Sequence, residues 1–359
     1  AGLDLYVLDA PHLFDRAGNI YLGPDGKDWE DNPQRFAALS QAAAAIATQK
    51  LDGWNPEVVH AHDWQAGLVP AYLEASGAPR VPTVLTIHNI AFQGLVPANM
   101  LNALELPSAG FTRDGFEYYG KISMLKAGMM ACDKLTTVSP TYACELMTPE
   151  FGMGLEGVAH VRAADFSGIL NGIDTEIWDP RTDPDLTAPY GTPEAKQANT
   201  QALRRELGLP ESDGPLAVVV SRLTTQKGID VLVEALPTLL AGGGQLAVLG
   251  SGDAMLEGLL GKAAQEHPGV ALHVGYNEAM SHRMIAGGDA ILVPSRFEPC
   301  GLTQLYGLRY GTLPLVARTG GLADTVIDAN PAGLRAGVAT GFQVAPLTAD
   351  TLAAAFRHM

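Results

Sequence analysis

The chain has 359 residues, which is enough for two domains of ordinary size and excludes a single small module. Hydrophobic residues make up 47% of the chain and charged residues 17%, a balance typical of a protein that buries large cores and not of a disordered one. The formal net charge of −16 repels polyphosphate backbones, so the composition argues against nucleic acid as a partner. A ligand that carries phosphate must therefore be bound by local cations and backbone N–H groups.

Short apolar runs alternate along the chain with longer stretches of helical length that are rich in Ala, Leu and Gly. In chain order, the predicted strands are 3–8, 58–60, 84–88, 135–139, 168–170, 216–221, 245–249, 270–274, 290–293 and 313–317. The predicted helices are 33–50, 115–131, 140–147, 228–241, 253–266, 301–310 and 349–358. Most of the strands are continuous apolar runs, as expected where helices cover both faces of a parallel sheet. The pattern therefore predicts an α/β protein.

A polar, proline-rich segment between 174 and 214 divides this pattern into two halves, with a short helix predicted at 200–207. We expect an N-terminal domain at 1–173 and a C-terminal domain at 174–359, the latter including the junction at 174–213. Each half contains several strands and helices in alternation, so each is expected to form its own parallel sheet.

The cysteine content and the absence of long apolar runs predict the compartment. The three cysteines form an odd set without the spacing of a metal site, and a chain of this length needs no disulfide bonds for stability. No apolar run approaches the roughly 18 residues that cross a bilayer, and no basic segment followed by an apolar one opens the chain. These features predict a cytoplasmic protein without a membrane partner.

Polar clusters follow the predicted strands and precede helices. In chain order they are HAHDWQ (60–65), HNIAFQG (88–94), SPT (139–141), NGID (171–174), SRLTTQKG (221–228), GSGD (250–253), SRFEPCG (295–301) and RTGGLAD (318–324). Open parallel sheets bind ligands beyond the carboxyl ends of their strands, so each domain is expected to gather its clusters at one edge. Two such edges that face each other would form one cleft between the domains.

Two features of the C-terminal half suit an anion. Gly320 and Gly321 open a predicted helix, where small residues let a ligand approach free N–H groups, although an ordinary turn from strand to helix has the same sequence pattern. Arg222 and Lys227 share a loop that ends in glycine. They have the chemistry to bind a diphosphate, and a pair of solvated basic residues explains them equally well.

Histidines mark two strand ends of the N-terminal half. His60 and His62 have strand spacing, which places both imidazoles on one face beside Asp63. A metal site needs further ligands that the local sequence does not offer, so hydrogen-bonded site or core residues are favoured. His88 precedes Asn89 at the next strand end, a pair suited to contact a sugar or a carbonyl group, while a structural role for a lone histidine stays open.

Several common enzyme classes lose support from missing motifs. Cys300 stands at a helix start without a neighbouring histidine, which weakens a cysteine hydrolase interpretation. Ser139 and Ser221 lack the G-x-S-x-G elbow of serine hydrolases. The chain has no P-loop motif, and its G-x-G sequences lack the context of a dinucleotide site, so kinase, ATPase and dehydrogenase functions are disfavoured.

The motifs taken together are more specific than any one of them. They are HAHDW (60–64), TIHNIAFQG (86–94), NGID (171–174), SRLTTQKG (221–228), SRFEPCGLTQLYGLRYG (295–311) and RTGGLADTV (318–326). In this order they closely resemble bacterial glycogen synthases, the ADP-glucose-dependent family that includes plant starch synthases. The resemblance extends through nearly the whole chain.

This resemblance implies a GT-B fold, in which two Rossmann-like domains face each other across a cleft. The N-terminal domain would hold the α-1,4-glucan, as glycogen or a maltooligosaccharide, and the C-terminal domain the nucleotide sugar. The implied reaction transfers glucose from ADP-glucose to the 4-hydroxyl group at a non-reducing end, with retention at the anomeric carbon. The implied enzyme needs no cofactor, neither a metal nor pyridoxal phosphate.

The resemblance also implies catalytic roles for four residues. Arg222 and Lys227 match the cations that stabilise the departing ADP, where leaving-group charge develops. Glu298 matches the active-site glutamate, for which contact with the donor glucose is the safer role because a nucleophilic role is disputed. His88 matches the residue that faces the transferred sugar.

Binding roles are implied for a further set. The expected nucleotide-binding residues are Ser221, Tyr276 beside the adenine, and Thr319, Gly320 and Gly321 as a backbone anion site. The expected sugar-site residues are Asp63, Asn171 and Cys300, of which Cys300 packs the site through its thiol. Related GT-B enzymes carry a second glutamate at the place of Tyr306, so ribose binding is expected to differ here.

The sequence departs from the family at both ends. Nothing like the family's Lys-Thr-Gly-Gly-Leu loop precedes Ala1, and the closing helix is not found after Met359. Either these segments are missing from this sequence, or the molecule is a fragment of doubtful activity. The alternative function is therefore a catalytically silent module that binds glucan or nucleotide sugar. A glucan phosphorylase shares the fold but needs pyridoxal phosphate on a lysine.

Overall fold

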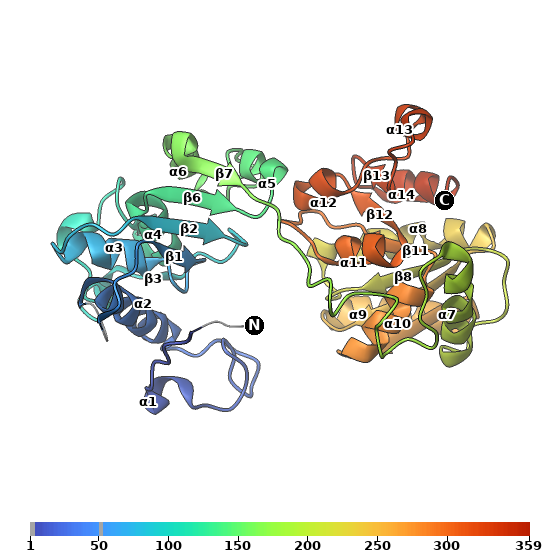
Figure 1. Cartoon of the computed structure of the whole chain (residues 1–359), viewed down its shortest axis with the longest axis horizontal. Coiled ribbons are helices and arrows are strands. Elements are labelled where there is room, and N and C mark those ends of the chain that lie inside the picture. Colours follow the sequence, from blue (N-terminus) through green and yellow to red (C-terminus); the bar gives the residue numbers. More distant parts are fainter. Residues whose placement is uncertain (1–3, 50–52) are drawn as a thin grey trace. The chain divides into compact units, whose positions relative to one another are not determined.

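The computed structural model describes residues 4–49 and 53–359, which form two compact units (Figure 1). The first unit, here unit 1, comprises the described residues up to Val138 together with Ala143–Ile169. The second, unit 2, comprises Ser139–Tyr142 and Leu170–Met359. No helix in these described ranges has the length and apolarity needed to cross a membrane.

Unit 1 is built on a four-stranded parallel sheet. Its strands, in spatial order, are β1 (Val59–His62), β2 (Thr83–Ile87), β6 (Lys134–Thr137) and β7 (Phe166–Gly168). The connections contain α3 (Leu68–Ala75), α4 (Met124–Ala131), α5 (Pro140–Glu145) and α6 (Glu156–Val161), and α2 (Asn32–Gln49) packs against α3. The first three residues of α5 belong to unit 2. All four strands point the same way, so their carboxyl ends meet at one edge.

Two glycines let α3 and α4 pack closely beside this sheet. A Cβ on Gly67 would lie 2.4 Å from the Met124 carbonyl oxygen, and one on Gly128 would lie 2.5 Å from the Gly67 carbonyl oxygen. Leu68 and Leu85 are fully buried next to this contact. Gly128 also lies against the Leu85 side chain, so the two helices pack in close backbone contact beside β2.

A small antiparallel sheet replaces the first half of the helix predicted at 115–131. It contains β3 (Leu95–Pro97), β4 (Glu117–Tyr118) and β5 (Lys121–Ser123), and only Met124–Ala131 is helical. Tyr119 and Gly120, with φ of 45° and 78°, form a two-residue turn between β4 and β5 that matches the twist of a hairpin. Ser123 then caps α4, because its side chain accepts a hydrogen bond from the Lys126 N–H.

The first predicted strand is also wrong in the part that the structure describes. Residue 3 of the predicted strand 3–8 lies outside the described residues, and 4–8 form no strand. Leu5 and Val7 are 80% and 82% exposed. An apolar run becomes a strand only where a neighbour satisfies its backbone hydrogen bonds, and 4–8 pair with no strand among the described residues. The predicted helix at 33–50 is α2, whose last predicted residue lies outside the described ranges.

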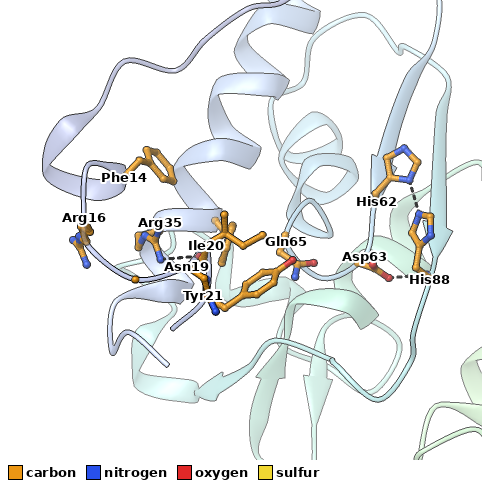
Figure 2. Close-up of a pocket in the computed structure, with 12 residues that line it drawn as sticks. Phe14, Arg16, Asn19, Ile20, Tyr21, Arg35, His62, Asp63, Gln65 and His88 are labelled. Carbon is orange, nitrogen blue, oxygen red and sulfur yellow. Dashed lines mark hydrogen bonds between the residues drawn. The ribbon is translucent and has the colours of Figure 1, made fainter. Parts of the chain in front are cut away.

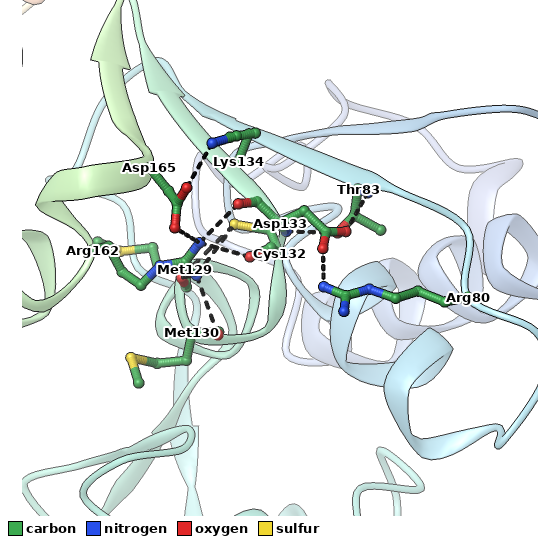
Figure 3. Close-up of polar contacts among 9 residues, drawn as sticks. All are labelled: Arg80, Thr83, Met129, Met130, Cys132, Asp133, Lys134, Arg162 and Asp165. Atoms are coloured by element: carbon green, nitrogen blue, oxygen red, sulfur yellow. Dashed lines mark hydrogen bonds and ion pairs between the residues drawn. The ribbon is translucent and has the colours of Figure 1, made fainter.

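Arg162 stabilises the end of α4, which leads into β6 (Figure 3). Its guanidinium donates hydrogen bonds to the carbonyl oxygens of Met129 at 2.6 Å and Cys132 at 2.7 Å. A helix end leaves such carbonyl groups unpaired, and a cation there also suits the helix dipole. Asp133 next accepts hydrogen bonds from the N–H and hydroxyl of Thr83, which ties the starts of β2 and β6 together.

Unit 2 is built on a six-stranded parallel sheet. Its strands, in spatial order, are β10 (Val270–Val274), β9 (Gln245–Gly250), β8 (Leu216–Val220), β11 (Ala290–Val293), β12 (Leu313–Ala317) and β13 (Phe342–Val344). The predicted bounds of β10, β11 and β12 are confirmed, and β13 was not predicted. In chain order, β8, β9 and β10 extend the sheet toward one edge, and β11, β12 and β13 then extend it toward the other edge. This reversal creates a switch point between β8 and β11, where such sheets bind ligands.

Helices cover both faces of this sheet. One face packs against α8 (Ile229–Ala241), α9 (Ala254–Glu266) and α14 (Ala349–Phe356). The other packs against α7 (Pro193–Glu206), α10 (Glu278–Gly287) and α11 (Thr303–Tyr310). Val218 belongs to one of these cores and Val219 to the other, as the two-residue period of a strand requires. Burial on both faces explains the continuous apolar strands.

The proline-rich junction packs onto unit 2 through aromatic rings. Trp178 lies between His282 and Tyr306, with ring centroids 3.8 and 3.7 Å apart and interplanar angles of 13°. His282 Nδ1 lies 2.7 Å from an Asp183 carboxylate oxygen, to which the Tyr310 hydroxyl also donates. The short helix predicted at 200–207 is part of α7, which begins at Pro193. The junction is therefore a folded part of unit 2.

Candidate functional site

An ion pair occupies the switch point of unit 2. Lys227 follows β8 and Glu298 follows β11, and the Lys227 ammonium lies 2.5 Å from Glu298 Oε2. The Ser295 hydroxyl donates to the same oxygen at 2.9 Å. The side chains of Lys227 and Glu298 are 17% and 9% exposed, so both charges are largely removed from water. Ser221 lines the same small cavity, which thus brings together three of the predicted site residues.

Glycine and arginine hold the two loops of this pair together. Gly228 has φ of 67°, and a Cβ there would lie 1.8 Å from the Pro294 carbonyl oxygen, so only glycine allows this approach. Arg296 donates from its guanidinium to both carboxylate oxygens of Asp230, at 2.7 and 2.6 Å. Its backbone N–H donates to the Gln226 carbonyl group at 2.8 Å. These contacts fix the positions of Lys227 and Glu298 before any ligand binds.

Gly320 and Gly321 lie against the loop that carries Glu298. A Cβ on Gly320 would be 2.0 Å from the Glu298 carbonyl oxygen, and one on Gly321 would be 2.3 Å from that of Cys300. The Gly321 N–H donates to the carbonyl oxygens of Glu298 and Pro299. The two glycines therefore allow α12 (Gly320–Thr325) to pack closely on this loop. Their expected role in anion binding, with the buried Thr319, stays a prediction.

The remaining predicted residues of unit 2 lie around this loop or farther out. Arg222 is exposed, and its guanidinium has no partner within the described ranges. Tyr276 is 85% exposed and donates to Glu278, which raises the pKa of the tyrosine. Cys300 is buried, and burial raises the pKa of its thiol although the Asn171 backbone hydrogen-bonds to it. A buried thiol of this kind is a packing group and a poor nucleophile.

Unit 1 contains a cavity of about 820 Å³ beside the ends of β1 and β2 (Figure 2). Polar and aromatic side chains line it, among them Arg16, Asn19, Tyr21, Arg35, His62, Asp63, Gln65 and His88. Rings that combine apolar faces with surrounding hydroxyl, amide and guanidinium groups suit a sugar, which presents both kinds of surface. The cavity brings together two predicted site residues, His88 and Asp63.

Asp63 shapes the turn that carries His88. Its backbone has φ of 52°, a left-handed conformation that aspartate tolerates better than most residues. One carboxylate oxygen accepts hydrogen bonds from the N–H groups of His88 at 2.7 Å and Asn89 at 3.3 Å. Burial raises the pKa of Asp63, against the effect of these hydrogen bonds. Asp63 thus holds the main chain of the β2 turn in place.

β1 extends two residues beyond its predicted end at His60, so His62 lies within the strand and not after it as predicted. Because β1 extends to His62, the imidazoles of His60 and His62 share one face, with ring centroids 4.2 Å apart, and this expectation is confirmed. His62 Nδ1 lies 3.0 Å from His88 Nε2. Burial, followed by the nearby charges of His60 and His88, lowers the pKa of His62.

Comparison with known proteins identifies the family. The profile of the starch synthase catalytic domain matches residues 1–161, and that of glycosyl transferases group 1 matches 199–359. The glycogen synthase of Paracoccus denitrificans is 67% identical over 355 residues, which cover 99% of this chain and 74% of the relative. That of Roseobacter denitrificans is 62% identical over 98% of this chain and 74% of its own length. The chain belongs to the glycogen synthase family.

Solved structures agree with this family. The catalytic domain of starch synthase IV from Arabidopsis thaliana, bound to ADP and acarbose, is 33% identical with a TM-score of 0.86. The match covers 98% of this chain and 73% of that one. The sucrose-phosphate synthase of Thermosynechococcus elongatus, at 20% identity and a TM-score of 0.57, shows a likeness of fold alone. The GT-B fold class and the glycosyltransferase assignment are confirmed, and the silent-module alternative is not supported over them.

Sequence reasoning missed much of the unit 1 cavity of this glycogen synthase family member. Tyr21 and Arg35 line it, but the segment before α2 follows no strand, so the rule that ligand residues follow strands does not indicate it. Arg35 is buried and donates to the Leu13 carbonyl oxygen at 2.7 Å and to Asn32 at 2.6 Å. It thereby holds the segment that presents Tyr21 to the cavity.

One group of described residues has the spacing of metal ligands. Asp183, Asp185 and His282 place one potential ligand atom each within 4.8 Å of one another. The Asp183 oxygen nearest His282 also accepts the Tyr310 hydroxyl hydrogen bond, and the Asp185 N–H donates to its other oxygen. These contacts already satisfy a buried carboxylate, so the group is explained by packing of the junction.

Proposed function

We propose that this chain transfers glucose from ADP-glucose to the 4-hydroxyl group at the non-reducing end of an α-1,4-glucan. The observation that carries the proposal is the Lys227–Glu298 pair at the switch point of unit 2, in a chain of the glycogen synthase family. The Arabidopsis relative bound to ADP and acarbose supports both ligand classes.

The donor would bind at unit 2. In this proposal the diphosphate of ADP-glucose contacts Lys227 and the guanidinium of Arg222, which has no partner among the described residues, because charge on the departing ADP must be stabilised as the glycosidic bond breaks. Glu298 neutralises Lys227 before the donor arrives. When the diphosphate replaces Glu298 as the partner of the Lys227 ammonium, the Glu298 carboxylate becomes available to accept hydrogen bonds from the donor glucose. Exposed Tyr276 offers its ring face to the adenine.

The acceptor would bind in the unit 1 cavity. Tyr21 provides an aromatic face for a glucose ring, and His88 and Asp63 line the same cavity. A cavity of about 820 Å³ accommodates several sugar units, as a glucan end requires. Transfer needs the acceptor hydroxyl and the anomeric carbon in one reacting complex.

None of these residues requires a metal or pyridoxal phosphate for its role. The proposed chemistry relies on Lys227 and Arg222 as cations for the diphosphate. We therefore expect activity to be unchanged by a chelator and the purified protein to lack a pyridoxal chromophore.

The test is an assay with ADP-glucose and maltoheptaose. We expect stoichiometric ADP release with growth of the glucan by single glucose units, and a much weaker reaction with UDP-glucose. Lys227→Met is the control, with turnover lowered by orders of magnitude. Binding of ADP-glucose and glucan without chain growth would contradict the proposal and favour the silent module.

A further inference from the structure

His88 is held from two sides in the unit 1 cavity. Its backbone N–H donates to Asp63 Oδ1 at 2.7 Å, and its ring nitrogen Nε2 lies 3.0 Å from His62 Nδ1. The two imidazoles point toward each other from β1 and from the end of β2 (Figure 2). Asp63 therefore fixes the main chain of His88, and His62 is the group that contacts its ring.

His62 is itself supported by a chain of contacts across the sheet. Its ring centroid lies 4.2 Å from that of His60, whose Nε2 is 2.7 Å from the Thr86 hydroxyl. The Thr86 hydroxyl is in turn 2.6 Å from that of Thr136. These contacts span β1, β2 and β6, so the His60 ring that lies against His62 is anchored on three strands of the unit 1 sheet.

The contact between the two rings restricts their protonation. Only one hydrogen fits between His62 Nδ1 and His88 Nε2, because a donor must face an acceptor. Whichever nitrogen carries it, the other nitrogen of His88 has a defined state as acceptor or donor. A free imidazole would instead exchange between its two neutral tautomers and rotate about its side-chain bonds.

We propose that His62 is a positioning residue that locks the imidazole of His88 in one tautomer and orientation for contact with the transferred sugar. The proposal rests on the proposed function for the sugar contact, but the lock itself is a property of the protein without substrate. The resemblance to the family implies no role in glucose transfer for His62.

The lock depends on pH through several groups. The titratable or charged side chains that face the pair are His60 on β1, Asp63 after β1, and Arg35 and Arg16 across the cavity. When both rings are protonated, no acceptor is left between them and the hydrogen bond is lost. The pKa of His62 lies below its usual value of 6.5, so we expect the lock to hold at neutral pH and to fail in acid.

The variants separate hydrogen bonding from bulk. His62→Asn places an amide group where Nδ1 of the imidazole stands, so we expect kcat within about threefold of the wild-type value. His62→Gln places its amide group one bond farther from the main chain than Nδ1, so it does not replace the hydrogen bond to His88. His62→Phe keeps a ring but no hydrogen bond. For His62→Gln and His62→Phe we expect kcat to fall about five- to tenfold with an unchanged KM for ADP-glucose. His160→Phe, at an exposed histidine of α6 that does not line the cavity, is the matched control, with near wild-type kcat.

The decisive readout is the tautomer of His88 in the substrate-free protein. Selective ¹⁵N labelling of the nine histidines, with His88 assigned from a His88→Gln spectrum, reports the protonation of each ring nitrogen. We expect one tautomer at neutral pH in the wild type and in His62→Asn, and averaged shifts in His62→Phe and His62→Gln. Averaged shifts in the wild type, or unchanged His88 shifts in His62→Phe, would overturn the lock. A locked His88 without glucose transfer would instead contradict the proposed function.

Discussion

The Lys227–Glu298 pair allows stability and catalysis to be separated. The two side chains are 17% and 9% exposed, and removing one partner of a buried pair costs about 3–5 kcal/mol. Glu298→Gln keeps a neutral acceptor for Lys227 and Ser295, so we expect a smaller loss of about 2 kcal/mol in the free energy of unfolding. Lys227→Met combined with Glu298→Gln removes both charges, and we expect it to recover most of that loss.

We expect these variants to rank differently in activity than in stability. Lys227→Met removes a preorganised cation from the proposed diphosphate site, and such groups are worth roughly 10²–10³-fold in turnover. The double variant should be no more active than Lys227→Met although it is more stable than Glu298→Gln. Urea unfolding gives the ranking in stability and ADP release gives the ranking in activity, both measured on the wild type, the two single variants and the double variant. Wild-type turnover in Lys227→Met, or a double variant as unstable as Glu298→Gln, would refute this account of the pair.

Three further predictions concern other parts of the chain. Replacing Tyr21 by Ala should raise the KM for maltoheptaose about tenfold and leave that for ADP-glucose unchanged in the ADP release assay, because only the glucan contacts its ring in the proposed complex. Arg162→Met should lower the free energy of unfolding by about 2–3 kcal/mol and speed amide exchange in α4, since four carbonyl groups at the helix end lose a donor. Burial lowers the pKa of Lys196 to about 7, so the folded state binds fewer protons than the unfolded one and stability should rise by up to about 1.4 kcal/mol per pH unit from pH 7 to 9. Urea unfolding of the wild type and of Lys196→Met, measured at each pH, gives the difference in their free energies of unfolding. We expect this difference to rise with pH at about this slope, and a difference that does not change with pH would contradict the prediction.

The parallel sheets could be predicted because burial on both faces leaves a clear pattern. The run at β8 is apolar at every position, since Val218 and Val219 enter different cores. The hairpin at Tyr119 and Gly120 could not be predicted from the sequence. The turn imposes the left-handed conformation on Tyr119, and tyrosine has no preference for that conformation. Helix α10 was missed because His282, a polar residue, is buried there with a carboxylate partner from the distant junction.

The candidate site shows the same division. The rule that ligand residues follow strands indicated Ser221, Lys227 and Glu298, which line one cavity. The pairing of Lys227 with Glu298, 71 residues apart, depends on the neighbouring positions of β8 and β11 and is not visible in the sequence. Tyr21 follows no strand, so the same rule had no means of finding it.

The position of the newly added glucose tests the central claim most directly. The chain is incubated with ADP-glucose labelled in the sugar and with glycogen, and the product is digested by an exo-acting amylase that removes maltose from non-reducing ends. We expect one ADP released for each glucose incorporated and all label in the first maltose units removed. Label that stays in the undigested core, or ADP release without incorporation, would contradict this expectation.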